Sequence, residues 1–218
     1  MITAIEPQKK DPKRVNIYLD GEFAFGISGI LAAWLKVGQS LSEEKINTLI
    51  SDDGLENTYQ KALHFMSVRP RSIAEVRKNL QGRDIPLILI EETVKRLQNN
   101  SLLNDLKFAQ DWVGNRNDFR PRSQSVLRLE LRMKGIAEED IQKALENNLD
   151  DETLALLAAQ KYKHRLKDLN KLEFRKKISG YLSRKGFSFT SINPVFTAIW
   201  NEIHPGSENG VSINNEEN

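Results

Sequence analysis

The chain has 218 residues, of which 39% are hydrophobic and 28% charged, and its formal net charge is +2. This composition indicates a globular protein with a highly charged surface and excludes a chain that is disordered throughout. The absence of cysteine excludes disulfides, thiolate metal sites, iron–sulfur clusters and cysteine nucleophiles.

Residues 14–27 alternate apolar and polar side chains around Asp20-Gly21, which predicts a β-hairpin. A two-residue Asp-Gly turn would pair Tyr18 with Phe23 and divide the apolar side chains between two faces. A three-residue loop, residues 19–21, would place them on one face, so we favour that register. It pairs Ile17 with Phe23 and Val15 with Phe25.

The rest of the first 53 residues predicts a third strand at residues 1–6 and two short helices near residues 29–34 and 42–50. We treat residues 1–53 as an N-terminal extension that contains the hairpin. At the other end, residues 205–218 contain three acidic residues, no basic residue and almost no apolar side chain, so a disordered acidic tail is expected there.

Between these ends, a pattern recurs with a period of 51 residues. Five apolar positions and one basic position keep this register over three copies. The clearest matches are Leu80-x-x-Arg83-Asp84-Ile85, Leu131-x-x-Lys134-Gly135-Ile136 and Leu182-x-x-Lys185-Gly186-Phe187. We therefore predict three repeats, at residues 54–103, 104–150 and 151–204.

Each repeat is expected to contain three helices. Ser72 and Glu75 form a capping-box pattern ahead of an apolar stripe at helical spacing. Asp84, Gly135 and Gly186 follow the last apolar position, where a left-handed residue ends a helix. The expected helices are residues 55–68, 73–80 and 86–97, then 105–115, 123–131 and 137–149, then 152–166, 175–182 and 191–203. The fold class is therefore mainly all-α, with three tandem three-helix repeats in an elongated array.

A search for catalytic, metal and cofactor motifs in the sequence finds none. His64, His164 and His204 lie far apart, and no Walker loop, G-x-G-x-x-G or G-x-S-x-G motif occurs. The acidic runs at residues 91–92, 138–140 and 150–152 are interpreted as helix starts, where negative charge offsets the helix dipole. We therefore expect a protein that is not an enzyme and needs no metal or other cofactor.

Basic residues are the most distinctive feature of the three repeats. Residues 161–186 hold ten basic and two acidic residues, and residues 107–135 hold seven and three. Such clustering favours a polyanionic partner, although solvated helix faces would give the same pattern. The acidic helix starts argue against base reading in the major groove of DNA, which leaves binding to a nucleic-acid backbone or to a protein surface.

At this point the chain resembles the RecX regulatory proteins of bacteria, which modulate the RecA recombinase. The resemblance covers residues 55–203, leaves out the N-terminal extension and departs from the family at Asp84, where a glycine is usual. The motifs that carry it are Arg69-Pro70-Arg71-Ser72-x-x-Glu75-Val76-x-x-x-Leu80, Asn104-Asp105-x-x-Phe108-Ala109-x-x-Trp112, Glu130-Leu131-x-x-Lys134-Gly135-Ile136 and Tyr181-Leu182-x-x-Lys185-Gly186-Phe187.

The resemblance implies binding in the groove of the RecA filament on single-stranded DNA, with weaker binding to double-stranded DNA. It implies inhibition of ATP hydrolysis, strand exchange and coprotease activity, through blocked filament growth or filament disassembly. Candidate contacts with the filament or DNA are Arg69, Arg71, Arg116, Arg120, Arg122, Arg128, Arg132, Lys134, Lys176, Lys177, Arg184 and Lys185.

Two other functions remain open on the residues alone. One is a helical-repeat protein that binds nucleic acid directly, and the other is a scaffold for a different protein partner. The start of the chain lacks a signal-peptide pattern, and no apolar stretch approaches the roughly 20 residues that span a bilayer, so a cytoplasmic protein without membrane contact is expected. Three repeats in one chain remove the need for a dimer, so we expect a monomer.

Overall fold

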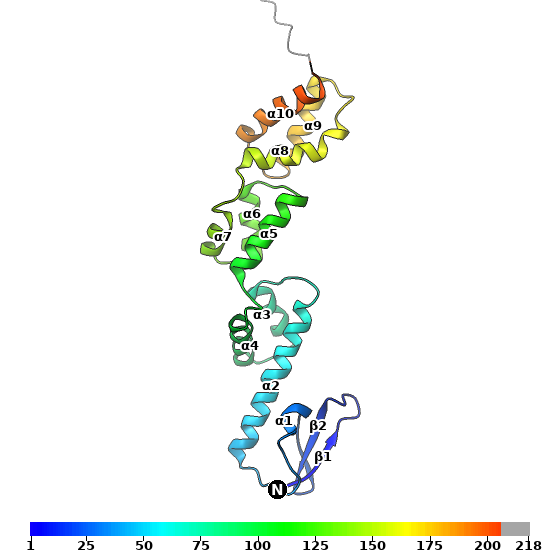
Figure 1. Cartoon of the computed structure of the whole chain (residues 1–218), viewed down its shortest axis with the longest axis vertical. Coiled ribbons are helices and arrows are strands. Elements are labelled where there is room, and N and C mark those ends of the chain that lie inside the picture. Colours follow the sequence, from blue (N-terminus) through cyan, green and yellow to red (C-terminus); the bar gives the residue numbers. More distant parts are fainter. Residues whose placement is uncertain (206–218) are drawn as a thin grey trace, which may run out of the picture. The chain divides into compact units, whose positions relative to one another are not determined.

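The computed structural model describes residues 1–205, and the acidic tail expected at residues 205–218 lies outside them except for its first residue. The described residues form three strands, ten α-helices and one short 3-10 helix (Figure 1). The chain divides into two compact units, Met1–Leu103 and a second that begins at Asn104. Within 1–205, no helix is both long and apolar enough to cross a membrane.

The first unit begins with a three-stranded antiparallel sheet. Its strands are β1 (Ile2–Pro7), β2 (Arg14–Leu19) and β3 (Glu22–Ser28), in the order β1-β2-β3. The third strand expected at residues 1–6 is thus confirmed. Ile2, Ile17, Phe25 and Ile27 form a small apolar core under the sheet.

The register predicted for the hairpin is wrong. Asp20 and Gly21 both have positive φ and form a two-residue turn that pairs Tyr18 with Phe23. A bulge follows, so that Ile17 lies opposite Phe25. The extra residue returns the apolar side chains to one face without a longer loop, and it leaves Phe23 60% exposed.

Two helices follow the sheet, α1 (Gly29–Ala32) and α2 (Glu43–Met66). The prediction of separate helices at 42–50 and 55–68 is wrong, because α2 runs through both without a break. Ser42 caps it by accepting a hydrogen bond from the backbone of Lys45. The boundary expected between residues 53 and 54 therefore lies inside a helix that belongs to both the sheet and the first repeat.

A buried ion pair ties the sheet to α2. Asp53 on α2 is only 6% exposed and accepts hydrogen bonds from the Arg14 guanidinium at 2.7 Å and from the backbone of Ser28 at 2.7 Å. Arg14 also donates to the carbonyl of Gly26 at 3.1 Å. One carboxylate thus satisfies donors from β2 and from the end of β3.

We expect Asp53→Asn to destabilise the attachment of the sheet to α2 by about 2–3 kcal/mol, because Arg14 then lacks its charged partner in a half-buried position. Faster exchange of the β2 and β3 backbone amides would report this loss. Asp52→Asn is the matched control, since its side chain is exposed on the same helix. Equal exchange in the two variants would contradict the role given to Asp53.

Three three-helix repeats make up the rest of the described chain. The end of α2 packs with α3 (Ile73–Gln81) and α4 (Leu87–Asn99) in the first unit. The second repeat contains α5 (Asp105–Phe119), α6 (Gln124–Met133) and α7 (Glu138–Leu145). The third contains α8 (Asp151–Tyr162), the 3-10 helix η1 (Lys163–Arg165), α9 (Lys171–Ser183) and α10 (Phe189–Ile203).

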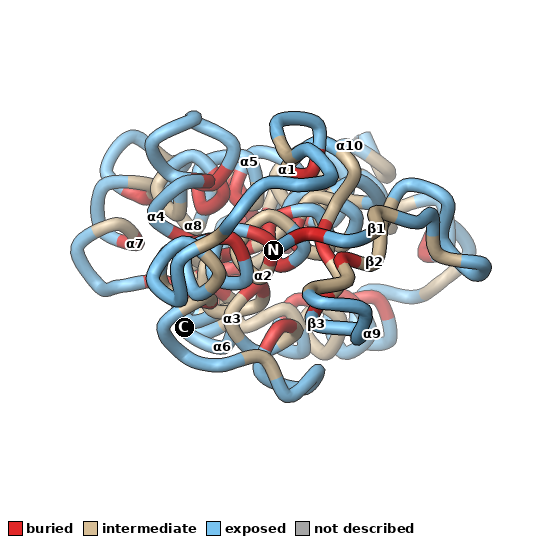
Figure 2. The backbone as a smooth tube through the Cα atoms, turned by 90° about the horizontal axis from the view of Figure 1, so that it is seen from below, coloured by how far each residue is buried: buried red, intermediate tan, exposed pale blue. Residues whose placement is uncertain are grey.

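The 51-residue period predicts equivalent positions in the three cores. Val76, Leu127 and Ile178 are fully buried, and so are Leu80, Leu131 and Leu182. Each repeat has its own apolar cluster. Figure 2 shows the buried positions as short red stretches within helices that are otherwise exposed or intermediate, as expected for small units with one apolar face per helix.

The caps and turns of the repeats also follow the sequence. Ser72 and Glu75 form the predicted capping box at the start of α3. The residues expected to be left-handed have φ of 56° at Asp84, 76° at Gly135 and 89° at Gly186.

Among the acidic runs, residues 138–140 lie in the first turn of α7 and residues 150–152 at the start of α8. Glu91 and Glu92 do not fit the prediction, because α4 begins four residues earlier, at Leu87. Glu91 instead pairs with Arg77 of α3 at 2.6 Å.

Candidate nucleic-acid interface

In the first unit, both candidate arginines have partners within the fold. Arg69 contacts both carboxylate oxygens of Glu75, at 2.9 and 3.2 Å, beside the capping box of α3. The guanidinium of Arg71 lies 4.0 Å from the centre of the Phe65 ring and donates to the Phe65 carbonyl at 3.3 Å. These contacts hold the loop before α3 against the end of α2.

Two candidates in the second repeat surround Trp112. Arg116 stacks over its indole at 4.3 Å and pairs with Glu130 at 2.8 Å, while the indole nitrogen donates to the same carboxylate at 2.8 Å. Lys134 lies 5.2 Å from the indole centre. This arrangement joins α5 to α6, so the charge of Arg116 is neutralised inside the repeat.

Arg128 and Arg132, one turn apart on α6, converge on a single acid. Both pair with Glu138, and the Nε of Arg132 lies 2.9 Å from its carboxylate. These hydrogen bonds, that from Arg132 foremost, hold the pKa of Glu138 below its usual value. Glu138 is therefore ionised at neutral pH and cancels one of the two positive charges.

A different group of cations gathers where the second and third repeats meet. We call Arg120, Arg122, Lys161 and Lys185 the junction cluster. The Lys185 ammonium donates to the Pro121 carbonyl at 3.1 Å, and the Lys161 ammonium donates to the Asp118 carbonyl. Burial lowers the pKa of Lys185, and the positive charges of Arg122, Arg120 and Lys161 lower it further. Lys185 is thus close enough to the other three cations to be repelled by them.

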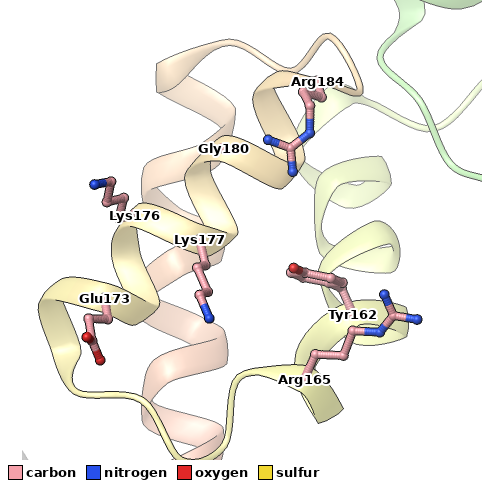
Figure 3. Close-up of a pocket in the computed structure, with 7 residues that line it drawn as sticks. All are labelled: Tyr162, Arg165, Glu173, Lys176, Lys177, Gly180 and Arg184. Carbon is pink, nitrogen blue, oxygen red and sulfur yellow. The ribbon is translucent and has the colours of Figure 1, made fainter.

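A second group of cations lines a hollow in the third repeat (Figure 3). We call Arg165, Lys176, Lys177 and Arg184 the hollow cations. The hollow has a volume of about 710 Å³, and Tyr162, Gly180 and a single acid, Glu173, complete its lining. In Figure 3 Lys177 projects from α9 towards the space in front of Tyr162 and Arg165. Within residues 1–205, none of the hollow cations forms an ion pair.

A pair of stacked tyrosines connects the two groups. The rings of Tyr162 on α8 and Tyr181 on α9 lie 4.0 Å apart and almost parallel. Lys185 lies 5.1 Å from the Tyr181 ring and Arg165 lies 5.8 Å from the Tyr162 ring. We name the junction cluster, the tyrosine pair and the hollow cations together the basic strip.

The chemistry of the basic strip is that of an anion-binding surface. Its eight cations face one lining acid and the shared Glu130, which lies 3.2 Å from Arg122. Burial raises the pKa of the Tyr181 phenol, so the hydroxyl stays protonated at neutral pH and can donate a hydrogen bond. Among residues 1–205 no group of three histidine, aspartate or glutamate side chains could hold a metal ion.

Comparison with known proteins identifies the family. Four family models match the chain in order: the regulatory protein RecX N-terminal domain at residues 1–42, and the first, second and third RecX three-helix domains at residues 59–97, 104–145 and 150–196. The chain belongs to the RecX regulatory protein family.

Individual relatives agree with this assignment. The chain is 35% identical to the regulatory protein RecX of Bacillus pumilus over 196 residues, which are 88% of this chain and 74% of that protein. It is 33% identical to the RecX of Bacillus subtilis over 202 residues, covering 91% and 76%. These relatives are named as regulatory proteins and not as enzymes.

Solved RecX structures share the fold. A crystal structure of regulatory protein RecX superposes with a TM-score of 0.66 at 29% identity, covering 92% of this chain and 98% of that one. The RecX of Lactobacillus salivarius superposes with a TM-score of 0.58 at 26% identity, covering 68% and 97%.

The family match corrects one expectation about the N-terminal sheet. Residues 1–53 were expected to be an extension outside the shared core. The RecX N-terminal domain covers residues 1–42, so the sheet is a regular part of the family. The sequence motifs that indicated the family all lie in the repeats. The hairpin pattern of the first residues could not indicate it, because such a pattern is common to many folds.

The structure separates the sequence-predicted candidates into two classes. Six of them lie in the basic strip: Arg120, Arg122, Lys176, Lys177, Arg184 and Lys185. The other six lie outside the strip and contact an acid or an aromatic ring of their own repeat: Arg69, Arg71, Arg116, Arg128, Arg132 and Lys134. Within the strip, Arg122 also contacts Glu130 and Lys185 lies beside the Tyr181 ring. Lys161, Arg165, Tyr162 and Tyr181 of the strip were missing from the candidates, because their place depends on how α8 packs against α9 and the α5–α6 loop.

Replacing one basic residue inside the basic strip should weaken binding to single-stranded DNA more than replacing one outside it. Arg132→Gln should reduce the salt dependence of the affinity less than Lys177→Gln does, because Glu138 cancels one of the two charges of Arg128 and Arg132. Lys177→Gln should reduce the slope of log affinity against log salt by about 0.7, the value of one phosphate contact on a single strand. Fluorescence anisotropy over a range of salt concentrations measures both slopes, and equal slopes would contradict the separation.

Proposed function

We propose that this chain binds the RecA filament on single-stranded DNA and inhibits RecA by blocking filament growth or promoting disassembly. The observation that carries the proposal is the basic strip, a surface of eight cations on a chain of the RecX regulatory family, in which the four hollow cations form no ion pair within residues 1–205. The expected consequences are lower ATP hydrolysis, strand exchange and coprotease activity of RecA.

The chemistry of the strip suits a phosphate backbone. Arginine presents paired donors that match phosphate oxygens, and lysine adds a mobile point charge. A single-stranded backbone has a regular series of negative charges, so several weak contacts add up along it. The affinity should therefore fall as salt concentration rises.

Repetition of the three-helix unit suits a polymeric partner. A filament presents the same surface on each protomer, and linked modules that contact neighbouring protomers bind more tightly than any one module alone. We place the DNA contacts in the second unit, where the basic strip lies.

Reading of base edges is not part of the proposal. The first turn of α7 carries Glu138, Glu139 and Asp140, which would face DNA phosphates unfavourably. Glu138 is also engaged by Arg128 and Arg132. Backbone binding without sequence preference is the mode that this charge distribution favours.

ATP hydrolysis by RecA from the same organism, measured on single-stranded DNA while this protein is titrated in, tests the proposal. Inhibition at well below one molecule per RecA monomer is expected, because capping or disassembly acts on many protomers at once. DNA binding by this protein alone is the control. The proposal fails if RecA hydrolyses ATP at an unchanged rate.

The control also discriminates the two alternative functions. Unchanged hydrolysis together with tight DNA binding would favour a direct nucleic-acid-binding protein. Phe119, 69% exposed beside Arg120, is the residue that would suit base stacking in that case. Unchanged hydrolysis without DNA binding would leave a scaffold for another protein.

A further inference from the structure

The contact between the second and third repeats is mainly polar. The backbone of Ser123 donates to the Lys185 carbonyl at 3.1 Å, and the backbone of Gln124 donates to Asp151 at 2.7 Å. The apolar clusters of the two repeats share no residue. A few hydrogen bonds stabilise the docking of the two repeats only weakly, because each of them replaces a hydrogen bond to water.

The apolar part of this contact is small and local. Gly186 lies so close to α6 that a Cβ atom there would come within 2.3 Å of a Val126 methyl group and 2.5 Å of the Ser123 hydroxyl. The turn after α9 therefore fits against the start of α6. This fit specifies the position of the third repeat but buries little apolar surface.

Positive charge opposes the same contact. Lys185 reaches across the junction to the Pro121 carbonyl in the α5–α6 loop, and Lys161 reaches the Asp118 carbonyl in the last turn of α5, next to Arg120 and Arg122. The acid that pairs with Arg122, Glu130, also pairs with Arg116. Burial is the main cause of the lowered pKa of Lys185, and the positive charges of Arg122, Arg120 and Lys161 lower it further, which is the part that reports repulsion at the junction.

We propose that phosphate groups of a nucleic-acid backbone bind the junction cluster and hold the second and third repeats together. An anion that binds only when the four cations are assembled must stabilise the docked arrangement by linkage. DNA bound at the hollow would then extend to the junction cluster and contact both groups of cations. Such binding would restrict the movement of the third repeat relative to the second. This inference rests on the proposed function and adds a conformational consequence to it.

The absence of cysteine allows a direct test in the full chain. Spin labels are placed on cysteines introduced at Gln142 in α7 and Asn193 in α10, both exposed. The distribution of distances between the labels is measured by pulsed electron spin resonance. A short oligo(dT) and inorganic phosphate at matched ionic strength are the two probes.

The expected result is that oligo(dT) narrows the distance distribution at least twofold, while inorganic phosphate has a much smaller effect. Arg120→Gln should give a narrower distribution than the parent protein without DNA, since one repelling charge is removed, and a smaller change on adding DNA. Equal narrowing by the two probes would overturn the assignment to a nucleic-acid backbone.

An unchanged distribution while anisotropy shows that oligo(dT) is bound would overturn the inference. The proposed function would stand in that case, because it requires only that RecA is inhibited. The proposed function is tested by a separate measurement, the rate of ATP hydrolysis by RecA. That rate does not depend on the distance between the labels.

Discussion

Replacing Lys176, Lys177 and Arg184 together by glutamine is expected to lower the affinity for single-stranded DNA by roughly 10–100-fold at moderate salt. The three side chains line one hollow and form no ion pair within residues 1–205, so their full charge is available to phosphates. Each lies on an exposed part of α9 or directly after it, and no core residue is changed. The fold should therefore survive the substitutions.

The salt dependence of the affinity shows how many phosphate contacts are lost. Loss of three phosphate contacts should reduce the slope of log affinity against log salt by about 2. The matched control replaces Lys9, Lys10 and Lys13, which are exposed before β2 in the first unit and carry the same total charge. If the control lost as much affinity as the hollow variant, the net charge of the chain would govern binding, and the hollow would not be the site.

Gly186→Ala is expected to open the junction between the second and third repeats. Gly186 has a φ of 89°, which costs an alanine about 1 kcal/mol, and the new methyl group would overlap a Val126 methyl and the Ser123 hydroxyl. Overpacking of this kind adds about 1–3 kcal/mol. The hydrogen bond from the Ser123 backbone to the Lys185 carbonyl should therefore open more often.

Hydrogen exchange at the Ser123 amide measures this opening directly. We expect exchange to be roughly 30-fold faster or more in Gly186→Ala, corresponding to about 2 kcal/mol. Gly38→Ala is the matched control, because Gly38 has the same φ of 89° but no heavy atom within 4 Å of the added methyl group. Exchange at Ser123 as slow as in Gly38→Ala would show that the close fit against α6 is not needed.

The repeats could be predicted from the sequence because their signals are local or periodic. Apolar residues spaced three and four apart define a helix face, and the 51-residue period transfers each assignment to the next copy. The left-handed turns at Asp84, Gly135 and Gly186 follow from the few residue types that accept positive φ. Such features need no knowledge of distant contacts.

The errors in the first unit come from contacts that the local sequence does not contain. Separate helices were expected on either side of Asp52-Asp53-Gly54, yet α2 runs through these residues, and Asp53 binds Arg14 and Ser28 of the sheet. The predicted hairpin register was wrong because a bulge after Phe23 shifts the pairing of β3 with β2 by one residue. A pattern of alternating side chains cannot show where an extra residue is inserted.

The site could be predicted by region but not residue by residue. Local charge counts found the two basic segments that form the strip. They could not show that Arg116 is neutralised by Glu130 and Arg132 by Glu138, because these partners come from neighbouring helices. For the same reason they did not select Lys161, whose partner carbonyl at Asp118 is 43 positions away.

The most direct test of the account is binding of the fluorescently labelled chain to preformed RecA filaments on single-stranded DNA. Three proteins are compared by co-sedimentation: the parent chain, the Lys176, Lys177 and Arg184 variant, and the Lys9, Lys10 and Lys13 control. We expect the parent and the control to bind alike and the hollow variant to bind at least tenfold more weakly. Equal binding by all three would contradict the claim that the basic strip holds this RecX-family chain on the filament.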